Sequence, residues 1–116
     1  MYVDWTRIKS FANEDDPEDL EWLKSMIQNL FENTLERLNE LDSLMENRDL
    51  AKIQSLLHQL KGVAANFGLV ILQNQCIRAE TEAKEGNQEK SIEESKKIRG
   101  IWEDTRIELQ NRYFPS

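Results

Sequence analysis

The chain has 116 residues, of which 32% are charged, and it contains four glycines and two prolines. This length supports a single hydrophobic core, so one domain spanning residues 1–116 is expected. The formal net charge of −7 argues against nucleic acid or an anionic membrane surface as a partner, because both repel an acidic surface.

The first half of the chain predicts a short helix followed by a long one. Residues 5–11 form a short amphipathic segment, and an acidic run at residues 13–16 follows it. Asp16 is a typical N-cap, Pro17 suits the first helical position, and the acidic residues after them favour a helix N-terminus. From there the helical period continues to a break at residues 47–49, through Leu20, Leu23, Ile27, Leu30, Thr34, Leu38, Leu41 and Met45.

The second half predicts three further helices. Asp49 begins the first and Gly68 ends it in the left-handed conformation, with an apolar stripe of Leu50, Ile53, Leu57, Leu60, Ala64 and Phe67. The next helix covers residues 69–85, and the last covers residues 89–111 with a less regular apolar face. Four long helices with short connections predict an all-α, up-and-down antiparallel four-helix bundle, with residues 1–14 as a short capping segment at one end.

His58 is the only histidine, and it lies outside the apolar stripe of its predicted helix. A helical turn of about 100° per residue places it roughly 140° from the centre of that stripe, so its imidazole should face water. Gly62 lies one turn on, and a glycine inside a helix costs about 1 kcal/mol, which access to the imidazole would explain. Lys61 would place an ammonium group beside a phosphoryl group on the ring. The pattern indicates a phosphorylatable histidine, although each residue taken singly also fits an ordinary solvated face or a helix kink.

The run from His58 to Gly68, HQLKGVAANFG, closely resembles the signature of histidine-containing phosphotransfer domains. In that signature a helix carries His-x-x-Lys-Gly, then small residues, then a glycine at the helix end. Positions on the following helix that agree with the family are Leu72, Cys76 and Glu80. The resemblance runs from about residue 15 to about residue 110, and only the part from Leu57 to Glu80 is specific. The departures from the commonest family residues bear on partner choice and are Leu57, Val63 and Leu69.

This resemblance implies a role for each residue of the His58 face. His58 would accept a phosphoryl group on Nε2, and Lys61 would steady the phosphoryl oxygens. Glu80 would accept a hydrogen bond from the other ring nitrogen, with an ordinary surface glutamate as an equal alternative. The residues expected at the docking surface are Gln54, Gly62 and Ala65.

The resemblance also implies partners. The protein would be a phosphorelay intermediate that takes a phosphoryl group from a receiver-domain aspartate of a hybrid sensor kinase or response regulator and passes it to another receiver aspartate. The chain has no nucleotide-binding motif, so no ATP-dependent kinase activity of its own is expected. We expect it to bind no cofactor or metal, with Mg²⁺ carried by the receiver domain, and to be a monomer.

Cysteine usage and the N-terminal residues bear on location. Cys76 is the only cysteine, so no internal disulfide is expected, and the N-terminal residues do not resemble a secretory signal. A cytoplasmic location is therefore expected. Two other interpretations stay open: the phosphoacceptor domain of a larger chemotaxis-type histidine kinase, and a non-catalytic helical interaction module whose histidine is incidental.

Overall fold

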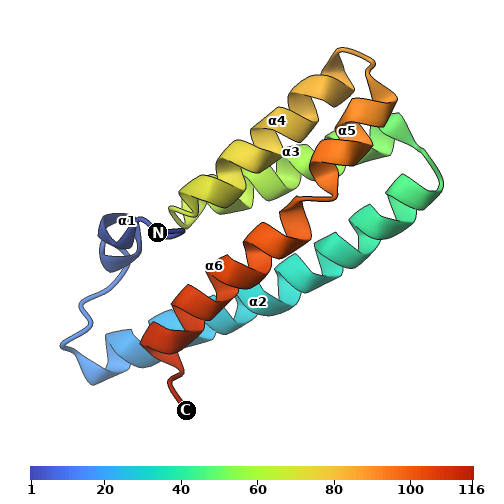
Figure 1. The fold of residues 1–116 in the computed structure, drawn as a ribbon. Coiled ribbons are helices and arrows are strands. Elements are labelled where there is room, and N and C mark those ends of the chain that lie inside the picture. The colour runs from blue at the N-terminus through green and yellow to red at the C-terminus, as the bar shows by residue number, and fades with distance from the viewer.

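The computed structural model describes all 116 residues and contains six helices and no strands. The helices are α1 (Trp5–Lys9), α2 (Pro17–Glu46), α3 (Leu50–Asn66), α4 (Val70–Lys84), α5 (Gln88–Ser95) and α6 (Ile98–Tyr113). Figure 1 shows α2, α3 and α4 running alternately up and down, with α5 and α6 together forming the fourth arm. The predicted all-α antiparallel bundle is confirmed. No helix is both long enough and apolar enough to cross a membrane.

The fourth arm corrects one prediction, because residues 89–111 do not form one continuous helix. α5 ends at Ser95 and α6 begins at Ile98. The apolar residues Ile92 and Ile98 are six positions apart, about 240° around a continuous helix, so a single stripe cannot bury both. With the break, both are buried: α5 packs against α4, and α6 packs against α4 and α2.

The predicted apolar stripes form the core. Every helix except α1 contributes several buried side chains, and α1 contributes Ile8. Of the residues predicted for the stripes of α2 and α3, those that are buried are Leu23, Ile27, Leu30, Thr34, Leu38, Leu41, Ile53, Leu57, Leu60 and Ala64. The apolar residues buried on α4 are Leu72, Cys76, Ala79 and Ala83. Burial raises the pKa of the Cys76 thiol to about 12, with a smaller contribution from the charge of Glu80, so this cysteine acts as a packing residue.

Residues 2–8 are tied to both α6 and the end of α3, at one end of the bundle. The Glu108 carboxylate on α6 accepts backbone hydrogen bonds from Tyr2 at 3.1 Å and from Val3 at 2.9 Å. Val3 is buried, and the backbone N–H of Asp4 donates to the carbonyl of Gly68 at 2.7 Å. We call these contacts the N-terminal clamp.

Gly68 is the point where the clamp meets the turn between α3 and α4. It has a φ of +69°, and a Cβ added there would lie 2.8 Å from the Cβ of Arg7. Arg7 in turn donates from Nε to the carbonyl of Asn66 at 2.8 Å. The glycine predicted to end the helix is thus required twice, by its left-handed backbone and by the close approach of α1.

Candidate functional site

Helix α3 presents His58 to solvent because its apolar stripe fixes its rotation. The Asp49 side chain caps its first turn by accepting from the N–H of Lys52 at 3.2 Å. The last turn closes through the N–H of Leu69, which donates to the carbonyl of Ala64 at 2.8 Å. With the stripe buried, the side chain of His58 is 69% exposed, and the prediction that it faces water is confirmed.

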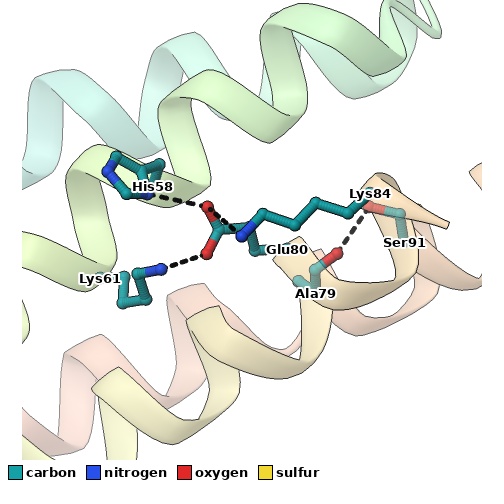
Figure 2. Close-up of polar contacts among 6 residues, drawn as sticks. All are labelled: His58, Lys61, Ala79, Glu80, Lys84 and Ser91. Atoms are coloured by element: carbon teal, nitrogen blue, oxygen red, sulfur yellow. Dashed lines mark hydrogen bonds and ion pairs between the residues drawn. The ribbon is translucent and has the colours of Figure 1, made fainter. Parts of the chain in front are cut away.

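A buried carboxylate holds one nitrogen of the exposed ring. Nδ1 of His58 lies 2.9 Å from Oε2 of Glu80, whose side chain is only 4% exposed (Figure 2). A carboxylate oxygen can only accept, so Nδ1 carries the hydrogen and the neutral ring keeps its lone pair on Nε2. Figure 2 shows this second nitrogen on the side of the ring away from Glu80.

Two lysines share the same carboxylate. Nζ of Lys61 on α3 donates to Oε1 of Glu80 at 2.5 Å, and Nζ of Lys84 on α4 lies 3.8 Å from Oε2. Burial raises the pKa of the Glu80 carboxyl. Hydrogen bonds from Lys61 and His58 outweigh that effect, and the two ammonium charges add to them, so the pKa lies below its ordinary value. Glu80 is therefore a carboxylate that stays charged. We call these four residues the Glu80 cluster.

The ring lies at the edge of a shallow surface depression of about 420 Å³. Its lining residues are Ala51, Gln54, Ser55, His58, Glu80 and Lys84. Gln54 is half-buried there, whereas Gly62 and Ala65 are exposed on α3 outside the depression. A Cβ added at Gly62 would meet nothing within 4 Å, so the space beside the ring is open.

The structure thus joins His58 and Lys61 through Glu80, three of the six residues singled out in the sequence, and Gln54 lines the same depression as His58 and Glu80. The alternative that Glu80 is an ordinary surface glutamate is wrong, because its side chain is buried and bound on both oxygens. Sequence reasoning missed Lys84. The available signal was its position four residues after Glu80, on the same face of the helix.

The helical bundle presents one solvent-facing histidine, and a buried carboxylate binds its Nδ1. This arrangement is typical of a class of proteins that can carry a chemical group on the exposed ring nitrogen. The family model "Hpt domain" matches residues 25–111, and the chain belongs to this family.

Two relatives agree with this assignment. The chain is 33% identical over 76 residues to multistep phosphorelay regulator 1 of Schizosaccharomyces pombe. The aligned residues cover 66% of this chain and 26% of that protein. It is also 33% identical over 76 residues to phosphorelay intermediate protein YPD1 of Candida albicans, covering 66% of this chain and 41% of that protein. The chain therefore spans less than half the length of either relative. No solved structure matches it significantly.

Proposed function

We propose that this protein is a phosphorelay intermediate that carries a phosphoryl group on His58. The observation that supports this most directly is the orientation of the ring. Glu80 engages Nδ1 at 2.9 Å, so the nucleophilic lone pair of Nε2 is on the exposed side. Membership of the Hpt domain family and the names of the two relatives support the same function.

In the proposed reaction, the Nε2 lone pair attacks the phosphorus of an aspartyl phosphate on a receiver domain. The N–P bond forms as the P–O bond to the aspartate breaks, and the aspartate leaves with the electron pair as a carboxylate. The ring gains positive charge while Nδ1 keeps its hydrogen, and the negative charge of Glu80 stabilises that state. The reverse reaction delivers the group to a second receiver aspartate, so no oxidation and no water are involved.

The other residues of the face support this chemistry. An ammonium group has three hydrogens, so Lys61 can hold Glu80 with one and direct the others to phosphoryl oxygens. Gly62 and Ala65 leave room for a docking receiver, and Gln54 is a contact at the rim of the depression. Both oxygens of Glu80 are engaged by nitrogen atoms, so the Mg²⁺ that phosphoryl transfer uses is proposed to come from the receiver.

We also propose a domain organisation, an oligomeric state and a location for the protein. The chain is a single domain over residues 1–116, with residues 1–14 as the capping segment, and acts as a monomer in the cytoplasm. It has no kinase activity with ATP, and a hybrid sensor kinase supplies its phosphoryl group through a receiver domain.

The test is phosphorylation by a phosphorylated receiver in the presence of Mg²⁺. Label should appear on the wild-type protein as an acid-labile, base-stable phosphoramidate, and His58→Gln should abolish it without changing the helical circular dichroism. ATP and Mg²⁺ alone should give no label. Label that persists in His58→Gln contradicts the assignment, and autophosphorylation with ATP supports the kinase-domain interpretation instead.

A further inference from the structure

The Glu80 cluster holds more positive charge than its carboxylate neutralises. Lys61 and Lys84 contribute two ammonium groups, and Glu80 contributes a single negative charge. One positive charge is therefore left over beside His58, in a chain whose net charge is −7. An uncompensated cation at this place attracts an anion to the exposed side of the ring.

The distances identify which lysine carries the uncompensated charge. Lys61 donates to Glu80 at 2.5 Å, and its side chain is 26% exposed. Lys84 lies 3.8 Å from Oε2, beyond hydrogen-bond distance, and its side chain is 53% exposed. Lys84 also lines the depression beside His58, whereas Lys61 does not. The ammonium group that is free to move is therefore that of Lys84.

We propose that Lys84 is a second cation for the phosphoryl group on His58, resting on the proposed function of this site. A phosphoryl group on Nε2 brings up to two negative charges to the mouth of the depression. Figure 2 shows Nζ of Lys84 beside the Glu80 carboxylate. The four methylenes of Lys84 make the side chain flexible, so its Nζ can leave Oε2 for a phosphoryl oxygen. Glu80 keeps Lys61 and Nδ1 of His58 as partners during this movement, so the ring stays oriented.

A merely structural role is the competing explanation, since Lys84 lies four residues after Glu80 on α4 and in the last turn of that helix. Such a lysine supports the helix weakly, whether or not His58 is phosphorylated. The two roles differ in one measurable property. A lysine that binds a phosphoryl oxygen lowers the pKa of the phosphoryl group clearly, whereas a lysine that stays farther away on the helix surface changes it little.

The experiment uses chemical phosphorylation, so that it does not depend on any receiver. The purified protein is treated with potassium phosphoramidate, and the phosphohistidine signal is titrated by phosphorus NMR; His58→Gln should lack that signal. In Lys84→Gln the titration midpoint of the phosphoryl group should rise by about half a pH unit, because a nearby positive charge favours its dianion. Lys84→Arg, which keeps the charge, should restore the wild-type midpoint.

The matched control is Lys90→Gln, which removes the same charge from an exposed lysine on α5. Its midpoint should equal that of the wild-type protein. A wild-type midpoint in Lys84→Gln, or an equal rise in Lys90→Gln, overturns the role of Lys84 while leaving the phosphorelay function intact. The opposite result is also possible: the wild-type protein forms phosphohistidine with phosphoramidate but accepts no phosphoryl group from receivers. That result contradicts the proposed function and leaves the role of Lys84 intact.

Discussion

The N-terminal clamp and the Glu80 cluster are both built around a carboxylate whose two oxygens are engaged, but their partners differ. Glu108 accepts from the backbone N–H groups of Tyr2 and Val3, which cannot move without moving the chain. Glu80 binds only side chains, and one of these, Lys84, is held at 3.8 Å. A carboxylate that binds backbone fixes the fold, whereas one that binds side chains orients them and lets them move.

The glycines of the two regions show the same contrast. Gly68 in the clamp has no room for a Cβ, with Arg7 2.8 Å away, and its φ is positive. Gly62 beside His58 lies in a regular helix with nothing within 4 Å. The first glycine is required by the folded structure. The second costs helix stability without a reason inside the protein, which is consistent with clearance for a partner.

The largest effect is expected where the cluster is broken. Glu80→Gln should slow phosphorylation of His58 by a receiver about 100-fold, because the neutral amide no longer stabilises the positive ring. The unfolding free energy should fall by about 1 kcal/mol, because the neutral amide weakens the hydrogen bonds from Lys61 and His58. Glu82→Gln on the same helix is the matched control and should transfer at the wild-type rate. Equal rates in all three proteins would remove Glu80 from the mechanism.

Breaking the N-terminal clamp should lower the stability of the fold and leave phosphorylation of His58 unchanged. Gly68→Ala should lower the unfolding free energy by about 2 kcal/mol, through the left-handed backbone and the contact with Arg7. Gly86→Ala also has a positive φ but open space around its Cβ, so it should cost only about 1 kcal/mol. Urea denaturation measures both. If the two variants lose the same stability, the close approach of α1 contributes nothing.

A milder break of the clamp is Glu108→Ala, which removes the acceptor for two backbone N–H groups. The unfolding free energy should fall by about 1 to 2 kcal/mol, and amide hydrogen exchange should accelerate at Tyr2 and Val3. Glu103→Ala, which breaks only an exposed pair with Arg106 on α6, should cost less than about 0.5 kcal/mol. Phosphorylation of His58 by phosphoramidate should be unchanged in both variants. A loss of labelling in Glu108→Ala would show that the N-terminal clamp and the Glu80 cluster are not independent.

Acid should weaken the Glu80 cluster, and a comparison of the wild-type protein with Glu80→Gln isolates the loss of stability. Despite burial, hydrogen bonds from Lys61 and His58 place the pKa of Glu80 below its ordinary value of 4.5. A carboxyl with a lowered folded pKa stabilises the protein fully above its unfolded pKa, and this contribution disappears as the pH falls through the folded pKa. The stability difference between the wild-type protein and Glu80→Gln should therefore shrink as the pH falls from about 7 to about 3.

That difference is needed because other carboxyls also respond to acid. Hydrogen bonds lower the pKa of Glu94, chiefly from Gln75, and that of Glu103, from Arg106. These contacts are present in both proteins, so they cancel in the comparison of urea midpoints. A stability difference that stays constant over the whole range contradicts a charged Glu80 in the fold.

The two regions also differ in how far the sequence predicts them. Helical periodicity was sufficient for α2, α3 and α4 and for the outward orientation of His58, because burial of one stripe fixes the rotation of a helix. The break before Ile98 is visible in the same pattern as a change of phase after Ile92. The clamp was predicted only as a cap, since its contacts join residues as distant as Tyr2 and Glu108, which no local pattern relates.

The Glu80 cluster is predicted from the sequence only in part, better than the N-terminal clamp and less well than the helices. The His-x-x-Lys-Gly pattern identifies α3, but the depth of Glu80 depends on how α4 is rotated against it. Cys76 and Ala83 mark the apolar face of α4, and Glu80 lies at the edge of that face, where its side chain is buried only because α3 packs over it. Lys84 was missed because a lysine four residues after a glutamate is an ordinary helix pair. What distinguishes it is the shared carboxylate, which only the packing of two helices creates.

The smallest expected effect is a gain in stability at the site itself. Gly62→Ala should raise the unfolding free energy by about 1 kcal/mol, because alanine is the better helix former and its Cβ meets no neighbour. Gly100→Ala on α6 also has open space and should give a similar gain. Urea denaturation of the two variants beside the wild-type protein measures both changes.

The function of the same glycine is tested by a larger side chain. Gly62→Leu keeps a good helix former, so the fold should remain at least as stable, and phosphoramidate should still label His58, because the small reagent does not need the surface of a docked domain. Transfer from a receiver should slow by about tenfold or more, since a side chain one turn from the ring blocks close approach, whereas Gly100→Leu should transfer normally. Normal transfer in Gly62→Leu would mean that Gly62 costs helix stability without giving a receiver access to His58. Gly62 and Gly68 would then no longer differ in the way that the Glu80 cluster and the N-terminal clamp differ.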